Sequence, residues 1–210
     1  MKVKVCGMRD ADNVRAVAQM GIDMMGFIFA PKSPRYTDKV PARTDADSKL
    51  LRTGVFVNAD EADILRRVGD FDLDCIQLHG TESRETCLQI RMKLEAIGKS
   101  VKIIKAISVK DAEDVKRYEE YEDIVDLFLF DTKTPLAGGS GKQFDWSVLD
   151  AYNGDVPFLL SGGIGPDDVE RVRNFHHPRC IGVDLNSKFE IEPGLKDVEK
   201  LREFLLKVKK

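Results

Sequence analysis

Eight short apolar runs alternate with charged stretches of helical periodicity along this 210-residue chain. Each run is three to seven residues long and nearly continuous in hydrophobicity, which is typical of parallel strands covered on the outside by helices. The runs are Val3–Cys6, Met24–Phe29, Gly54–Val57, Cys75–Leu78, Val101–Ile107, Leu127–Phe130, Phe158–Leu160 and Ile181–Leu185.

The stretches between the runs carry signals for helices. Val14 and Val17 share one helical face behind Asp10, whose side chain suits an N-cap. Pro166 suits the first turn of a later helix. The stretch 38–47 has little periodicity, so we expect its helix to be short or irregular.

Alternating strands and helices predict βαβ units and a parallel sheet. Eight units form either a closed barrel or an open, doubly wound sheet. The unit length is regular, and no glycine-rich turn of the dinucleotide-binding type follows the first run. Both observations favour an α/β fold with a single (β/α)8 TIM barrel, one catalytic domain over residues 1–210.

Composition narrows the choice of partners and compartment. Charged residues make up 33% of the chain, and the net charge is only −3, so no nucleic-acid or membrane partner is expected. No apolar run approaches the roughly 18 residues that a membrane span needs. The four cysteines form no C-x-x-C pair, which argues against disulfides and zinc and for a cytoplasmic protein. Whether the chain forms a homo-oligomer is left open.

In such a barrel the active site lies at the carboxyl ends of the strands. There, glycines and small polar residues let backbone N–H groups approach an anion, and a helix N-terminus adds attraction. One such cluster would be read as a tight turn, but three on consecutive strand ends predict a phosphate site. Their residues are Gly138–Gly141, whose segment could also form a lid, Ser161, Gly162, Gly163, Asn186 and Ser187.

Two titratable residues follow apolar runs on opposite sides of the expected barrel. Cys6 is a competent base if its surroundings lower its pKa, or else a small buried hydrophobe. Asp131 can protonate a departing oxygen if its pKa is raised, or else caps a loop.

Three further residues are candidates for binding substrate. The guanidinium fork of Arg35 suits a carboxylate or phosphate, although a surface charge is an equal reading. His79 donates to substrate or only braces its loop, and Asp184 binds substrate or supports the eighth loop.

These strand ends together resemble phosphoribosylanthranilate isomerases, and the matching segments follow the family's order along nearly the whole chain. The segments are Lys4–Met8, Gly26–Arg35, Gly54–Asn58, Gln77–Gly80, Phe130–Thr132, Gly138–Gly141, Phe144–Trp146, Ser161–Ile164, Gly182–Asp184, Pro193–Gly194 and Lys196–Asp197.

The resemblance implies a role for each matching residue. Cys6 would be the general base, Asp131 the general acid, and Arg35 the ligand of the anthranilate carboxylate. Lys188 stands where the family has a glycine, and Ser161 where it often has alanine. Backbone amides would hold the phosphate around Gly141, Gly162, Gly163, Asn186 and Ser187.

The implied reaction is the Amadori rearrangement of N-(5-phosphoribosyl)anthranilate in tryptophan biosynthesis. It would need no metal or organic cofactor, because the substrate's own nitrogen is the electron sink. Two alternatives stay open at this point. The histidine-pathway aldose–ketose isomerase uses an aspartate where this chain has Cys6, and a non-catalytic phosphate-binding barrel would need neither Cys6 nor Asp131.

Overall fold

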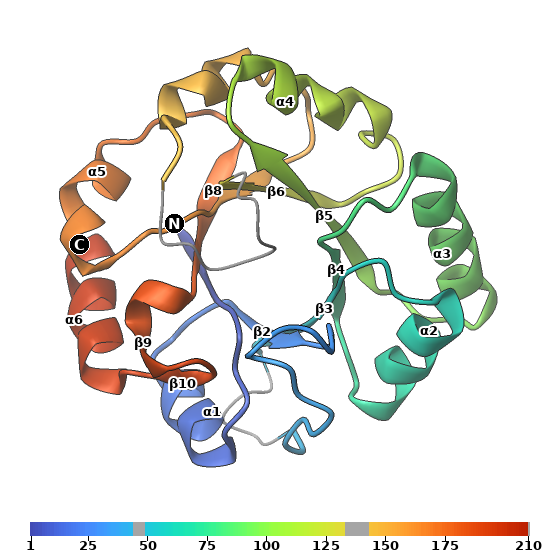
Figure 1. Ribbon diagram of the computed structural model, residues 1–210, viewed down its shortest axis with the longest axis horizontal. Coiled ribbons are helices and arrows are strands. Elements are labelled where there is room, and N and C mark those ends of the chain that lie inside the picture. The colour runs from blue at the N-terminus through green and yellow to red at the C-terminus, as the bar shows by residue number, and fades with distance from the viewer. Residues whose placement is uncertain (44–48, 133–142, 210) are drawn as a thin grey trace.

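Eight parallel strands close into one barrel, and helices form a ring around it (Figure 1). The computed structural model describes residues 1–43, 49–132 and 143–209. Each of the eight apolar runs lies on a strand, so the closed barrel is confirmed and the open sheet is excluded. The strands are β1 Lys2–Val5, β2 Met24–Ile28, β3 Leu51–Phe56, β4 Cys75–Leu78, β5 Lys102–Val109, β6 Leu127–Thr132, β7 Phe158–Leu160 and β8 Cys180–Leu185.

The helices begin where the sequence carries capping side chains. The Asp10 carboxylate accepts a hydrogen bond of 2.8 Å from the Asn13 backbone N–H, as an N-cap does. Pro166 opens a 3-10 turn, η4 Pro166–Asp168, that continues into α5. The helices are α1 Ala11–Ala18, α2 Glu61–Asp70, α3 Arg84–Ala96, α4 Ala112–Lys116, α5 Val169–Arg173 and α6 Val198–Val208, with further 3-10 turns η2 Arg117–Glu120, η3 Trp146–Ala151 and η5 Ser187–Phe189.

The second unit departs from the regular pattern, as its weak periodicity predicted. Within the described part of the segment between β2 and β3 there is no α-helix. The eighth loop holds a feature that the sequence did not signal, a short antiparallel pair of β9 Glu190–Glu192 and β10 Leu195–Lys196. This pair lies close to the barrel mouth and supplies two charged residues to the site described below.

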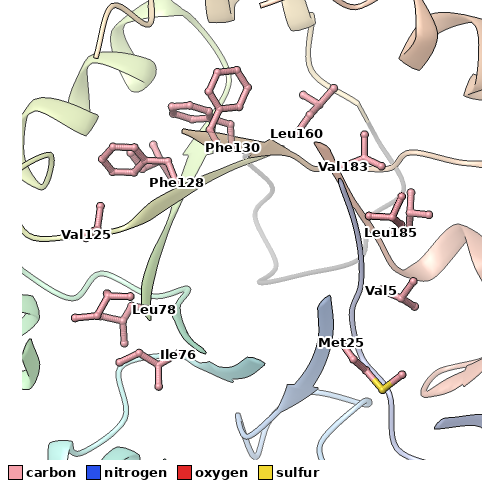
Figure 2. Close-up of a cluster of buried hydrophobic side chains, with 14 of the residues drawn as sticks. Val5, Met25, Ile76, Leu78, Val125, Phe128, Phe130, Leu160, Val183 and Leu185 are labelled. Atoms are coloured by element: carbon pink, nitrogen blue, oxygen red, sulfur yellow. The ribbon is translucent and has the colours of Figure 1, made fainter. Parts of the chain in front are cut away.

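Strand side chains alternate between two apolar regions. One set points outward and packs beneath the helices, as Figure 2 shows for Val5, Met25 and Leu185. The other set fills the barrel interior and includes Met24 and Leu129. No helix among the described residues is long and apolar enough to cross a membrane.

Candidate active site

The candidate residues of several strands share the inward face of the barrel. On β1, Val3 and Val5 join the core beneath the helices, so Lys4 and Cys6 face the interior. The same alternation turns residues at the ends of β4, β6, β7 and β8 inward, and direct contacts join several of them. These inward candidates are Cys6, His79, Asp131, Ser161 and Asp184.

Cys6 follows β1 directly and is held on rigid backbone. Its N–H donates to the Leu185 carbonyl at 2.9 Å, and only 4% of the residue is exposed. Gly26 of β2 makes room for the thiol, because a Cβ at that position would lie 2.7 Å from the Cys6 Sγ. A glycine is therefore required opposite the candidate base.

The charges around Cys6 oppose one another. Burial raises the pKa of the Cys6 thiol above its ordinary value of 9.0, because the thiolate loses its hydration. Lys4 and Lys196 lower this pKa, whereas Asp184 raises it further. A lowered pKa would favour Cys6 as a base, but in the structure the pKa is raised, because burial outweighs the two ammonium groups.

Asp131 lies at the end of β6 and is oriented by two neighbours. Its Oδ1 accepts a 2.8 Å hydrogen bond from the Thr132 N–H, and its Oδ2 lies 3.3 Å from the His79 Nε2. The Gln77 amide donates to the His79 Nδ1 at 2.7 Å, which leaves the proton of a neutral ring on Nε2, facing Asp131. About a fifth of the Asp131 side chain is exposed, so the carboxyl group is reachable from the mouth.

Arg35 is buried and already holds one carboxylate. Its Nε and Nη2 donate to both carboxylate oxygens of Glu190 at 2.7–3.0 Å. Lys196 also donates to the Glu190 Oε1 at 2.6 Å, and although burial raises the pKa of Glu190, these cations bring it below its ordinary value. The Nη1 of Arg35 makes no hydrogen bond to the described residues, so this edge is the one left for a ligand.

The ends of β7 and β8 form the candidate anion site. Gly162 and Gly163 have left-handed φ angles of 93° and 69°, and a Cβ on Gly162 would lie 2.2 Å from the Thr132 Oγ1. At these strand ends, four backbone N–H groups donate to no acceptor among the described residues, as an anion site needs. They belong to Gly162, Gly163, Asn186 and Ser187. Gly141 and the rest of Gly138–Gly141 lie outside the described residues.

The change from glycine to Lys188 does not strain the eighth loop. Lys188 lies in the 3-10 turn η5, and it is not among the described non-glycine residues with positive φ. Its stem lies over Gly165, where an added Cβ would be 3.4 Å from the Lys188 Cβ. The lysine therefore brings a positive charge to the edge of the candidate anion site.

Asp184 is less available to a substrate than the sequence suggested. Its Oδ1 pairs with the Lys4 ammonium at 2.8 Å, and its Oδ2 accepts a 3.4 Å hydrogen bond from the Ser161 hydroxyl. Only 6% of the side chain is exposed. A contact between Asp184 and substrate stays a prediction.

Sequence reasoning missed four residues that shape the site. Lys4 was not among the candidate residues, although its spacing of two residues from Cys6 places it on the inward face. Gln77 orients His79 and belongs to the matched Gln-Leu-His-Gly segment. Glu190 and Lys196 come from the unpredicted β9–β10 pair, so no strand-end signal could have found them.

The fold and the mouth define a (β/α)8-barrel enzyme with a cysteine and an aspartate on separate strands of one site. A family model for N-(5'-phosphoribosyl)anthranilate (PRA) isomerase matches residues 3–207, and the chain belongs to this family.

Known relatives agree with this family assignment. The isomerase of Parabacteroides distasonis is 47% identical over 212 residues, covering 99% of this chain and 93% of the relative. The Thermotoga maritima crystal structure is 32% identical, with a TM-score of 0.82 and coverage of 100% and 98%. A third structure, 29% identical with a TM-score of 0.78 and the same coverage, is a PRA isomerase in complex with reduced 1-(o-carboxyphenylamino)-1-deoxyribulose 5-phosphate.

The protein is therefore an isomerase of tryptophan biosynthesis. It converts N-(5'-phosphoribosyl)anthranilate to 1-(2-carboxyphenylamino)-1-deoxyribulose 5-phosphate. This assignment decides against the histidine-pathway isomerase and the non-catalytic barrel that the sequence left open.

Proposed function

We propose that Cys6 is the general base and Asp131 the general acid of this isomerisation. The observation that carries the proposal is their shared position on the inward face of one barrel mouth. Both follow rigid strands, and Asp131 is oriented by the Thr132 N–H and the His79 ring. A proton donor and a proton acceptor fixed on separate strands can act on one sugar held between them.

The proposed reaction begins at Asp131. The carboxylic acid protonates the ring oxygen, and the ring C1–O bond breaks to give an open-chain iminium ion. The positive nitrogen acidifies the neighbouring C2–H, and its charge favours the thiolate form of Cys6 at the same moment. Cys6 removes the C2 proton and leaves an enolamine.

Tautomerisation then restores the starting protonation state. C1 of the enolamine accepts one proton, and the C2 hydroxyl releases one as it becomes the ketone. The two transfers return the thiolate and the carboxylic acid, so the reaction is a net isomerisation. General acid and general base catalysis contribute about 10² to 10⁴ each.

Substrate binding is proposed to use both ends of the molecule. The phosphate would accept hydrogen bonds from the N–H groups of Gly162, Gly163, Asn186 and Ser187, which have no acceptor among the described residues, and Ser161 and Gly141 would also bind it. The anthranilate carboxylate would bind the free Nη1 edge of Arg35, and His79 and Asp184 would contact the sugar. The related structure with a reduced product analogue supports a phosphorylated ligand of this shape.

Two broader expectations belong to the same proposal. The chain would work as one catalytic domain over residues 1–210. It would act in the cytoplasm, because all four cysteines are free and a reducing compartment keeps them so.

Kinetics on two conservative variants test the acid and base roles. Cys6→Ser replaces the thiol by a hydroxyl with a far higher pKa, and Asp131→Asn keeps the shape but cannot release a proton. Each change is expected to lower kcat at least about 10²-fold, while product-analogue affinity stays within about tenfold. Near-normal turnover of either variant would remove that residue from its role.

A further inference from the structure

Two fully buried lysines lie close to Cys6. Lys4 and Lys196 are each at most 1% exposed, although a buried ammonium group is costly unless it is paired. Lys4 pairs with Asp184 at 2.8 Å, and Lys196 pairs with Glu190 at 2.6 Å. An apolar residue of similar size would cost less free energy to bury at either position, so packing alone does not explain the two lysines.

The register of the barrel places Lys4 beneath the thiol. Lys4 and Cys6 are two residues apart on the inward face of β1, and Lys4 is the direct cross-strand partner of Asp184 on β8. The Lys4 ammonium donates a hydrogen bond to Asp184, and it is close enough to Cys6 to lower the pKa of the thiol. It therefore lies next to both the candidate base and a carboxylate.

Lys196 approaches from the eighth loop. Its Nζ donates to the Asn186 Oδ1 at 2.9 Å and to Glu190, and it is close enough to Cys6 for each to shift the pKa of the other. The charged groups that face Cys6 are thus Lys4 on β1, Asp184 on β8 and Lys196 on β10, whereas β2 presents only Gly26.

The charges of this cluster do not balance while Cys6 is a thiol. Three cations, Lys4, Lys196 and Arg35, face only two carboxylates, Asp184 and Glu190. A thiolate at Cys6 completes the balance. A buried group of charges is most stable when it is neutral as a whole, so the cations of this cluster oppose the effect of burial on Cys6.

We propose that Lys4 and Lys196 stabilise the thiolate form of Cys6 and that Asp184 opposes this stabilisation. The consequence for catalysis rests on the base role proposed above for Cys6. Both lysines are positioning residues, because neither is exposed to the mouth and each acts through the thiol. Without them, burial would raise the pKa of the thiol further.

Direct titration of the thiol tests this proposal without reference to activity. The protein is labelled with cysteine carrying ¹³C at Cβ, whose chemical shift reports the ionisation of the thiol, and Cys6→Ser identifies the Cys6 signal. Lys4→Met and Lys196→Met should each raise the pKa of Cys6 by at least about 1, the effect of one nearby opposite charge. Asp184→Asn should lower this pKa.

The Cys6 pKa is expected to shift in opposite directions in the lysine and Asp184 variants, which distinguishes an electrostatic effect from structural damage. A purely structural role would shift the titration in the same direction in the Lys4 and Asp184 variants, or not at all, and either result overturns the proposal. The double variant Lys4→Met/Asp184→Asn removes both charges of the pair, and its Cys6 pKa should lie between those of the single variants. It provides a test if Lys4→Met alone folds poorly. Lys2→Met, an exposed charge removed from the same strand, is the matched control and should leave the titration unchanged.

A second readout links the titration to the reaction. The part of the pH profile in which kcat/KM increases with pH should move to higher pH in Lys4→Met, by the same amount as the pKa of the thiol. If the titrations move as expected but Cys6→Ser remains active, the electrostatic proposal stands and the base role fails. The two hypotheses can therefore fail separately.

Discussion

Gly26→Ala places one methyl group against the candidate base. The added Cβ would lie 2.7 Å from the Cys6 Sγ and 3.1 Å from its Cα, whereas ordinary contacts between such atoms are about 3.5–4.0 Å. The thiol must therefore move by about 1 Å, and the backbone of β1 cannot easily yield. Overpacking of this kind costs about 1–3 kcal/mol of stability, and a displacement of about 1 Å costs about 10² in rate.

Steady-state kinetics and thermal unfolding on the same variant separate these two effects. We expect kcat to fall about 10²-fold, with a smaller change in KM, in a protein that still folds cooperatively. Gly69→Ala is the matched control, because nothing lies within 4 Å of its added Cβ, and it should keep full activity and gain slightly in stability. Normal turnover in Gly26→Ala would refute the claim that the reaction depends on the position of the Cys6 thiol.

Three further predictions follow from the charges at the mouth. Arg35→Lys keeps the charge but loses the planar fork, so KM for the substrate should rise more than kcat falls, and an unchanged KM would exclude Arg35 from the carboxylate site. Glu190→Gln leaves Arg35 and Lys196 buried without their carboxylate and should cost about 3–5 kcal/mol in urea unfolding at neutral pH. The pKa of Glu190 is below its ordinary value of 4.5. Ionised Glu190 therefore stabilises the folded protein above pH 4.5, and this stabilisation is lost as the pH falls through the folded-state pKa. A difference in unfolding free energy between wild type and variant that does not shrink in acid would contradict this. Lys188→Gly should weaken binding of inorganic phosphate several-fold in calorimetry at low salt and much less at high salt, and equal losses in both would argue against a charge effect.

The fold could be predicted from the sequence because each strand is a buried apolar run between amphipathic segments. The same logic failed at the eighth loop. Glu190–Glu192 and Leu195–Lys196 are short and rich in charge, and Glu190 and Lys196 tie the pair to Arg35 and Asn186. No periodicity of two or 3.6 residues marks such a pair in the sequence.

The candidate site could be predicted in part, for a related reason. Cys6 and Asp131 directly follow apolar strands, so topology alone sends both to one edge of the barrel. Lys4 and Glu190 owe their importance to partners far away in the chain, Asp184 and Arg35. The direction of the Cys6 pKa was also beyond the sequence, because it depends on how deeply the thiol is buried.

A crystal structure with the reduced product analogue tests the central claim most directly. We expect the sugar to lie between Cys6 and Asp131, with their reactive atoms no more than about 10 Å apart and each within hydrogen-bond reach of the ligand. The phosphate should accept hydrogen bonds from the N–H groups of Gly162–Gly163 and Asn186–Ser187. A sugar out of reach of Cys6 or Asp131 would exclude the proposed acid and base, and a phosphate bound elsewhere would exclude the proposed anion site.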